Sequence, residues 1–535
     1  MHAQEHEVFS ADERAFLAPY FTNLDRPVFA LRNLPEVVKG ALFARYSRSP
    51  KSVRRLFLEE FLDRTEGTPG VEVGVERAER LYERVFDEYG DDSVAQLGGV
   101  HVACEGVSNV LTKVLEWGRL MAYLEQSTRY IPYDTKVGGR WRYVVPPELE
   151  EHPLRATYEE TLDHLFATYT DWLPRLQTYF AQRFPREPGD PEAAYRRSIR
   201  AKALDTLRGL LPAATQANVG LFGTAQAYEL LLLRMRAHPL GEARRCADWM
   251  LAELRKVIPA FLRRVDRPDR GEQWSAYLRA TREATRKITR AFTGNATVEP
   301  RPEVVLTDFD PDGETKVVAA ALYASSHLPD DELLALARRM TAEEREQVLR
   351  AYVGERQNRR HKPGRAFERT FYRFDVLTDY GAFRDLQRHR MLTIEWQPFS
   401  PDHGYEVPEA VNDAGAAADW RLAMERSAAL YERLCRAGLE EVAPYALCFA
   451  FRIRFYMQMN AREAMHVLEL RTSPQGHPVY RRVCQEMHRL IAEVAGHRAI
   501  AEAMKFVNYG SVDLGRLGAE RARELRQQER PVPSR

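Results

Sequence analysis

Apolar side chains return at intervals of three and four residues along most of this chain. That spacing is typical of helices that bury one face against a core. The pattern predicts a helix at 273–292, near the middle of the chain. The other clear stretches are residues 158–183, 242–264, 418–437 and 479–494.

Strand-like patterns are short and few in comparison. Runs of apolar and β-branched residues occur at 28–31, 142–145 and 304–307. Three such runs are too few for a doubly wound parallel sheet, in which strands alternate with helices. We therefore predict a helix-rich α+β fold.

The chain also contains an internal repeat. Residues 41–49 resemble residues 320–326 with an offset of 277, and residues 230–234 resemble residues 467–471 with an offset of 237. Similar segments that recur in the same order indicate duplicated structural units. The alternative is two unrelated domains whose helices resemble each other by chance.

The two offsets differ, so one half must carry additional residues. Three prolines interrupt the helical pattern at 181–200, and we expect the extra loop there. The junction between the halves falls within residues 264–303. The prediction is two tandem domains, residues 1–290 and 291–535.

Length and charge narrow the class of protein. A chain of 535 residues is long enough for more than one hydrophobic core. Its 78 basic and 77 acidic side chains nearly cancel, so no net field attracts nucleic acid or an anionic membrane. The first residues lack a signal peptide, and no apolar stretch approaches the length that spans a bilayer. We expect a cytoplasmic protein with neither a membrane nor a nucleic-acid partner.

Several common sites are absent from the sequence. It has no glycine-rich dinucleotide or phosphate loop, no His-Glu-x-x-His motif and no Cys-x-x-Cys pair. The five cysteines lie far apart, as expected of buried thiols rather than of a zinc site or a disulfide framework. No metal site is predicted.

One cluster of charge stands out in the second half, where Arg388, His389 and Arg390 are consecutive. Adjacent cationic groups need water or an anion to offset their charge. The tripeptide is therefore a candidate anion site. The alternative is a helix end exposed to solvent.

A second candidate lies in the first half at residues 125–130. In an extended segment Glu125, Ser127 and Arg129 project to the same side, because side chains alternate between faces. A carboxylate, a hydroxyl and a guanidinium in a row suit a phosphate and a polar base. The alternative is an exposed strand edge that carries an ion pair.

Together these segments resemble the flavin-dependent thymidylate synthase family. The resemblance covers nearly the whole chain, and the order and spacing of the motifs are more specific than any one of them. In the first half, the family's Tyr-Gly-His-x-Ser, Gly-Val-Ser-Arg and Glu-x-Ser-x-Arg motifs are matched by residues 89–93, 105–109 and 125–130. In the second half, its Arg-His-Arg, Asn-x-Arg and His-Phe-Leu-x-Leu-Arg motifs are matched by residues 388–390, 460–462 and 466–471.

Each half departs from the family pattern where the other half keeps it. In the first half, residues 117–119 read Trp-Gly-Arg instead of Arg-His-Arg, and Asp91 replaces the motif histidine. In the second half, the positions equivalent to Glu125, Ser127, Arg129 and Arg208 hold Trp396, Pro398, Ser400 and Pro444. The resemblance therefore implies a division of labour between the two domains.

The first domain is implied to recognise a pyrimidine nucleotide. Its arginines would neutralise the phosphate, Ser127 would orient the base, and nearby positive charge would stabilise the enolate that forms on the ring. Ser127 and Arg208 are the implied catalytic residues. The implied substrate-binding residues are Glu125, Ser127, Arg129, Arg208 and Arg234.

The second domain is implied to hold FAD. Asn460 and Arg471 are eleven residues apart, close to three helical turns, and so share one helix face. For Arg471 the alternative is a cation that stabilises the end of a helix. The implied cofactor-binding residues are Arg388, His389, Arg390, Asn460, Arg462 and Arg471.

Three histidines have weaker claims on a site. His238 and His466 can equally serve in structural hydrogen bonds. His361 is a candidate replacement for the histidine lost at Asp91, but a shift of one residue in the alignment of 359–368 changes that assignment.

The family's reaction defines the expected function. FAD would act as carrier and reductant in the transfer of a one-carbon unit to C5 of a deoxyuridylate-like nucleotide, with methylenetetrahydrofolate and NADPH as co-substrates. Family members are homotetramers, so a fused pair of domains would form a homodimer. The alternative is a non-catalytic relative that binds flavin or nucleotide as a regulatory protein.

Overall fold

The structure is a computed structural model that describes residues 7–47, 49–60, 96–294, 296, 299–510, 514–515, 517–518 and 521. The chain divides into two compact units. Unit 1 is formed by residues 1–105, 114–125 and 218–296, and unit 2 by residues 106–113, 126–217 and 297–535. Unit 2 therefore draws on both halves of the sequence, and the boundary between domains at residue 290 stays a prediction.

Unit 1 combines a small sheet with helices. The sheet has the order β1-β3-β2, and β2 pairs antiparallel with β3 from Met121 opposite Gly223 to Glu125 opposite Val219. Strands β1 and β3 continue into unit 2. The elements are α1 (Ala11–Leu17), α2 (Glu36–Tyr46), α3 (Val53–Glu60), β1 (Gly99–Ser108), β2 (Met121–Glu125), β3 (Gln216–Thr224), α8 (Ala225–Arg236), α9 (Gly241–Leu254), η5 (Pro259–Leu262), η6 (Pro268–Glu272) and α10 (Gln273–Thr293).

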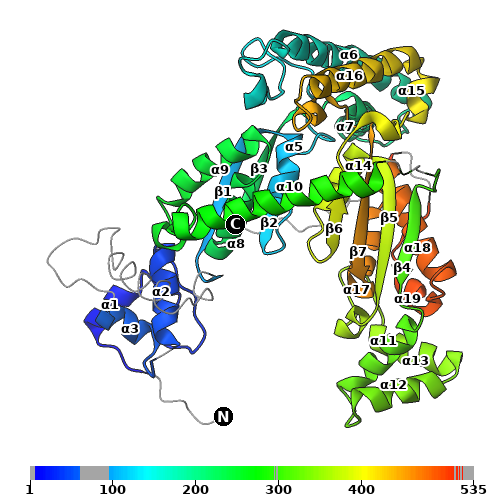
Figure 1. Cartoon of the computed structure of the whole chain (residues 1–535). Helices are drawn as coiled ribbons and strands as arrows, with labels where there is room; N and C mark the ends of the chain where they lie inside the picture. The colour runs from blue at the N-terminus through cyan, green and yellow to red at the C-terminus, as the bar shows by residue number, and fades with distance from the viewer. Residues whose placement is uncertain are drawn as a thin grey trace. The chain divides into compact units, whose positions relative to one another are not determined.

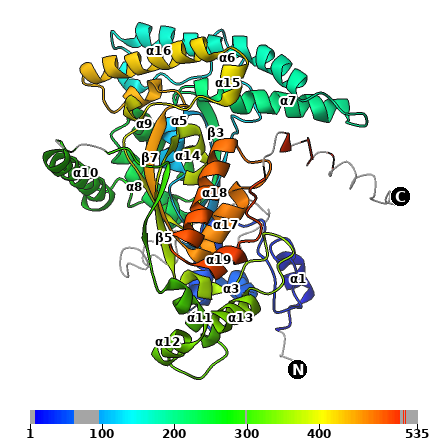
Figure 2. The same cartoon turned by 90° about the vertical axis from the view of Figure 1, so that its right-hand side faces the viewer.

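Unit 2 contains an antiparallel sheet of order β4-β5-β7-β6. Its strands are β4 (Val304–Phe309), β5 (Phe371–Asp379), β6 (Thr393–Trp396) and β7 (Arg452–Asn460). Helices α17 (Ala461–Arg471) and α18 (Pro478–Glu493) lie against the sheet, as Figures 1 and 2 show.

The other elements of unit 2 surround this sheet or form a separate helical layer. The long helices α6 and α16 pack side by side in that layer. The elements are α5 (Asn109–Leu115), η3 (Pro147–Leu149), α6 (Arg155–Arg183), α7 (Glu192–Leu207), η4 (Arg208–Leu210), α11 (Gly313–Tyr323), α12 (Asp330–Arg339), α13 (Ala342–Val353), η7 (Arg365–Glu368), α14 (Tyr380–Gln387), η8 (Pro401–His403), α15 (Glu409–Asp413), α16 (Ala417–Arg436), η9 (Ala443–Ala446) and α19 (Arg498–Ala503).

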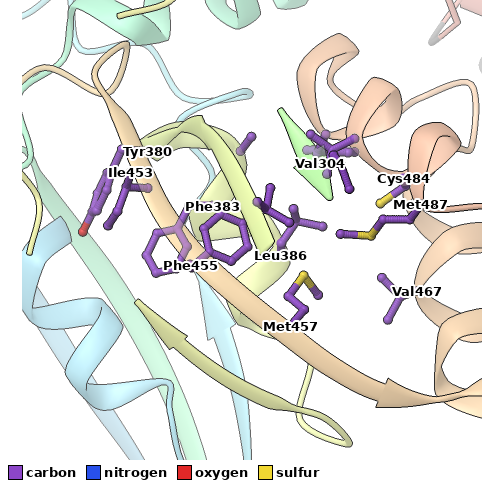
Figure 3. Packing of buried hydrophobic residues seen from close by; sticks show 14 of the residues in the cluster. Val304, Tyr380, Phe383, Leu386, Ile453, Phe455, Met457, Val467, Cys484 and Met487 are labelled. Atoms are coloured by element: carbon purple, nitrogen blue, oxygen red, sulfur yellow. The ribbon is translucent and has the colours of Figure 1, made fainter. Parts of the chain in front are cut away.

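The core of unit 2 follows from the alternation of side chains along β7. Ile453, Phe455 and Met457 are buried at every second position of this strand. The ring of Phe383 in α14 packs at a tilt against that of Phe455, and Figure 3 shows these side chains together with those of α17 and α18. The sheet thus fixes where the C-terminal end of α14 lies, and that end carries the Arg-His-Arg tripeptide.

The sequence repeat is visible in the order of elements. Strand, helix and strand β1-α5-β2 recur as β5-α14-β6, and strand, helix and helix β3-α8-α9 recur as β7-α17-α18. A shift of 236 residues moves the bounds of β3 onto those of β7. The two sheets have matching strand orders, and β4 is an additional edge strand in the second. The α+β fold with two tandem copies is therefore confirmed.

Equivalent segments of the two copies pair with each other inside unit 2. The amide of Ala213 donates to the carbonyl of Leu447 over 2.8 Å, and the amide of Phe449 donates to the carbonyl of Leu211 over 2.9 Å. Leu211 and Leu447 are 236 residues apart, as are Ala213 and Phe449. The contact resembles the self-complementary interface of a symmetric dimer.

Most long helices were predicted correctly, but several boundaries and strands were not. The predicted helix 242–264 ends at Leu254, because Pro259 begins a separate short turn. The predicted loop 181–200 is largely wrong, since α7 begins at Glu192 directly after Pro191. A proline is compatible with a helix start because the first amides need no intrahelical acceptor.

Two of the three predicted strands were also wrong. Residues 28–31 contribute one isolated bridge, between Leu31 and Phe21, and residues 142–145 contribute one between Tyr143 and Thr215. Only 304–307 is a strand, within β4. Among the described residues, no helix combines the length and apolarity needed to cross a membrane.

Candidate functional site

Arg129 lies in a buried turn of unit 2 rather than in an extended strand. Strand β2 ends at Glu125, and the hydroxyl of Ser127 accepts a hydrogen bond from the Arg129 amide over 3.2 Å. The predicted row of side chains from 125 to 129 is therefore wrong, because the turn breaks the alternation of faces. Arg129 is 9% exposed, so the alternative interpretation of this segment as an exposed strand edge is also excluded.

The Arg129 guanidinium has a defined set of partners. It donates to both carboxylate oxygens of Asp205 over 2.9 and 2.8 Å, to the Tyr480 hydroxyl over 2.8 Å and to the Gln475 carbonyl over 3.0 Å. Burial alone would lower the pKa of Arg129, but the Asp205 carboxylate outweighs it and raises that pKa. Arg129 stays charged and is held by residues of both halves.

Arg208 follows α7 and is almost fully buried in the turn η4. Its Nη1 donates to Asp385 over 3.3 Å, whereas its Nη2 lies 4.0 Å from Asp379 and has no hydrogen-bond partner among the residues that the structure describes. The guanidinium fits because residue 381 is a glycine: an added Cβ would lie 3.0 Å from Arg208 Nε. Arg208 thus keeps an unused N–H donor in a buried position.

Asp385 of α14 is the centre of this charge cluster. Its carboxylate lies 3.3 Å from Arg208, 2.6 Å from Arg388 and 3.7 Å from Arg471. Burial raises the pKa of Asp385, but these arginines together with Arg129 override that effect and hold it far below its usual range. The carboxylate is therefore ionised at any working pH.

His389 lies between the Asp385 charge cluster and a second carboxylate, that of Glu463. Arg471 Nε donates to His389 Nε2 over 2.8 Å, and His389 Nδ1 faces Glu463 at 3.7 Å. Burial lowers the pKa of His389 to about 4, although Glu463 opposes the shift. The neighbouring His389 and His466 rings overcome burial and lower the pKa of Glu463 to about 2. A neutral imidazole thus lies beside an ionised carboxylate.

His389, Glu463 and His466 offer possible ligand atoms that all lie within 4.8 Å of one another. A metal on His389 Nδ1 would require the ring proton on Nε2, where Arg471 already donates. Two donors would then face each other. The tautomer that this hydrogen bond selects favours a hydrogen-bonded cluster over a metal site.

The remaining residues implied for FAD lie at the ends of α14 and α17. Asn460 caps α17 by accepting from the Glu463 amide over 2.9 Å, and Arg462 donates to the Pro363 carbonyl over 3.0 Å. Arg390 is exposed and Arg388 partly so. Surface guanidinium groups beside a buried neutral histidine fit a cofactor that carries a pyrophosphate.

A cavity of about 390 Å³ lies beside Arg129 and Arg208 in unit 2. Asp205, Lys202 and His477 also line it, and its apolar wall includes Trp420 and Phe449. Its volume is within the range of small-molecule sites. Arginines predicted from the first half and elements of the second half therefore share one cavity.

His477 and three aspartates were missed by the sequence prediction. Burial and the nearby Arg208 and Arg129 lower the pKa of His477, which caps α18 and contacts the Asp205 carbonyl over 3.1 Å. Asp205, Asp379 and Asp385 lack a motif of their own. Only the position of Asp385, three residues before Arg388, was a usable signal.

The other predicted residues lie in unit 1 or in local structural contacts. Glu125 is buried at the end of β2, and Arg234 lies 4.5 Å from the centre of the Trp117 ring. His238 accepts from the Leu240 amide over 3.2 Å, and burial lowers its pKa to about 3. His361 contacts Asn358 within its own loop. Asp91 and residues 89–93 lie outside the described residues.

Comparisons with known proteins place the chain among relatives of nearly equal length. A UPF0159 protein of Chlamydia pneumoniae is 40% identical and covers 97% of this chain and 98% of its own. UPF0159 protein Ta1429 of Thermoplasma acidophilum is 31% identical, and the match covers 90% of this chain and 97% of that protein. A flavin-dependent thymidylate synthase of Clostridium tetani is 27% identical over 32% of this chain and 64% of its own.

A solved structure and a family comparison complete these findings. A UMP/dUMP methylase, PolB from Streptomyces cacaoi, bound with 5-Br dUMP, has a TM-score of 0.31 and 21% identity over 38% of this chain and 97% of its own. A sequence model of the thymidylate synthase complementing proteins matches residues 40–260 and 305–496, one segment in each half. The chain therefore belongs to the thymidylate synthase complementing protein family, in which it carries the family domain in tandem.

Proposed function

We propose that this protein is a thymidylate-synthase-like enzyme that transfers a one-carbon unit to C5 of a deoxyuridylate-like nucleotide. Family membership supports the reaction class. The single observation that supports the nucleotide site is Arg208, which lines a cavity and whose buried Nη2 has no acceptor among the described residues. A buried donor without a partner is costly, and a phosphate oxygen would supply the missing acceptor.

The residues of the cavity have distinct roles in this proposal. Arg129 and Arg208 bind the phosphate, and the Asp205 and Asp385 carboxylates hold both guanidinium groups in place. The same positive charge stabilises negative charge that develops on the pyrimidine ring, because donors fixed in a buried site need little reorganisation. Ser127 orders the turn that positions Arg129.

The cofactor would be held by Arg388, Arg390 and Arg462, with the neutral His389 as a further hydrogen-bonding group. When bound, FAD supplies the redox chemistry and carries the one-carbon unit. Tyr480 links the two groups of residues, since its ring centre lies 5.7 Å from the Arg129 guanidinium and 5.5 Å from that of Arg471. Methylenetetrahydrofolate, NADPH and a homodimeric assembly belong to the same proposal.

Calorimetric titration of the full chain with dUMP tests the nucleotide site. Arg208→Met should weaken binding about 10- to 100-fold, because a charged hydrogen bond to the phosphate is lost. Arg436→Met on the exposed face of α16 is the matched control and should bind as the wild type does. Equal affinity of the two variants would contradict the proposal.

Turnover separates the enzyme from a binding protein. With FAD, methylenetetrahydrofolate and NADPH present, the wild type should convert dUMP to dTMP. A chain that binds dUMP tightly but never converts it would favour the alternative of a regulatory relative.

A further inference from the structure

Two more residues that line the cavity resemble Arg208 in having a buried polar atom without a hydrogen-bond partner among the described residues. Ser198 Oγ and Trp420 Nε1 are buried and have no hydrogen-bond partner within the described part of the chain, and the two residues are 4% and 2% exposed. A buried polar atom of this kind destabilises the protein when it is left without a partner. Its recurrence on one cavity wall points to acceptors that a ligand brings.

The local packing holds Trp420 firmly in this position. A Cβ added at Gly209 would lie 2.6 Å from Cη2 of the Trp420 ring, so the absence of a side chain at 209 lets the indole lie against the backbone beside Arg208. Helix α16 contributes Trp420, and α7 contributes Ser198. The indole N–H and the serine hydroxyl are therefore held by helices from different halves of the sequence.

Trp420 and Ser198 are already desolvated in the free chain. The three buried atoms have almost no accessible surface of their own, so a ligand reaches them through small side-chain adjustments of the kind common on binding. Because the cost of removing water has been met on folding, an acceptor that arrives gains most of the hydrogen-bond energy.

The chemistry of the wall selects the kind of acceptor. An indole N–H only donates, and a planar ring suits the aromatic wall that Trp420 and Phe449 form. Uracil and cytosine share the carbonyl oxygen O2 and differ at ring position 4. Uracil has the carbonyl oxygen O4 there, whereas cytosine has an amino group, which would oppose the indole N–H as a second donor.

On the basis of the proposed function, we infer that Trp420 and Ser198 form the base subsite of this cavity and select a uracil ring over a cytosine ring. Arg208 and Arg129 then hold the phosphate, and Trp420 Nε1 donates to the O4 carbonyl oxygen of the ring. Neither residue belongs to the motifs that identify the family in this sequence.

The test compares the binding of dUMP, dCMP and inorganic phosphate to the full chain by calorimetry. The wild type should bind dUMP about 10-fold more tightly than dCMP. Trp420→Phe should weaken dUMP about 3- to 10-fold, leave dCMP and phosphate nearly unchanged, and so remove the preference. Ser198→Ala should weaken dUMP about 3-fold and is the variant least able to disturb folding.

The outcomes distinguish this inference from the function on which it rests. If both variants keep the wild-type preference for dUMP, or if Trp420→Phe weakens phosphate as much as dUMP, the base subsite is wrong while the phosphate site stands. If the wild type binds none of the three ligands, or if Arg208→Met has no effect, the proposed function fails as well.

Discussion

Arg234 of the first copy and Arg471 of the second end related helices but have opposite surroundings. Arg471 contacts the Asp385 carboxylate and the His389 ring, whereas Arg234 lies over the Trp117 ring. Arg471 follows its cap residue Asn460 by eleven residues, and Arg234 follows its cap residue Thr224 by ten. One residue turns a helix by about 100°, so the two arginines leave their helices in different directions.

The partners of the two arginines also differ because the neighbouring residues are not the same in the two copies. Position 385 is an aspartate, while its equivalent in the first copy, 271 residues earlier, is Val114. Burial lowers the pKa of Arg234, and the Tyr123 hydroxyl opposes this weakly. Duplication therefore left one copy with a charged cluster and the other with an aromatic contact. Each prediction below tests that contrast.

The largest effect is expected from Asp385→Asn, which keeps the size of the side chain but removes its charge. Arg208, Arg388 and Arg471 would then lose a shared counter-ion, and breaking a buried ion pair costs about 3–5 kcal/mol. The midpoint of urea unfolding should fall sharply. Asp413→Asn at the surface is the control and should change stability by less than 1 kcal/mol.

A pH-dependent effect is expected from Asp379→Asn. Burial raises the pKa of Asp379 to about 6 even though Arg208 opposes it, whereas the unfolded value is about 4. The protonated Asp379 carboxyl therefore contributes its full stabilisation below pH 4, and this contribution is lost as the pH rises through 6. The loss is about 3 kcal/mol.

Asparagine keeps the cap on α14, where Asp379 accepts from the Ala382 amide over 2.7 Å, but carries no charge. As the pH rises from 4 to 8, the free energy of unfolding of the variant should therefore increase relative to that of the wild type. The first copy offers the comparison, since the neutral Ser108 caps α5 at the equivalent position. A difference between variant and wild type that is constant with pH would refute the shift.

The smallest effect is expected from the paired variants Arg471→Met and Arg234→Met. The first removes charged hydrogen bonds and should cost about 2 kcal/mol. The second gives up a cation–π contact worth about 1 kcal/mol but also removes a partly buried charge, so its net cost should be below 1 kcal/mol. Thermal unfolding of both variants measures the difference, and equal costs would show that the two surroundings are energetically alike.

The sequence predicted those site residues that belong to a continuous motif, and it missed those that reach the site only through tertiary packing. Arg388 and His389 belong to one motif and Arg471 to another, and the repeat indicated that two copies exist. Asp205 gave no such signal, because it meets Arg129 through a contact between residues 76 positions apart. Trp420 gave none either, because its place beside Gly209 depends on how the two halves pack, including the pairing of residues 209–214 with 445–450. The strand prediction also failed at β5 and β7, since β-branched residues are sparse in both and their burial is set by the sheet.

The central claim is that the Arg208 cavity binds the phosphate of a pyrimidine nucleotide. A crystal structure of the full chain grown with dUMP tests it most directly. We expect the phosphate within hydrogen-bond distance of Arg208 Nη2 and Arg129, and the uracil ring beside Trp420. A nucleotide bound elsewhere in the chain, with the cavity filled only by water, would contradict this account.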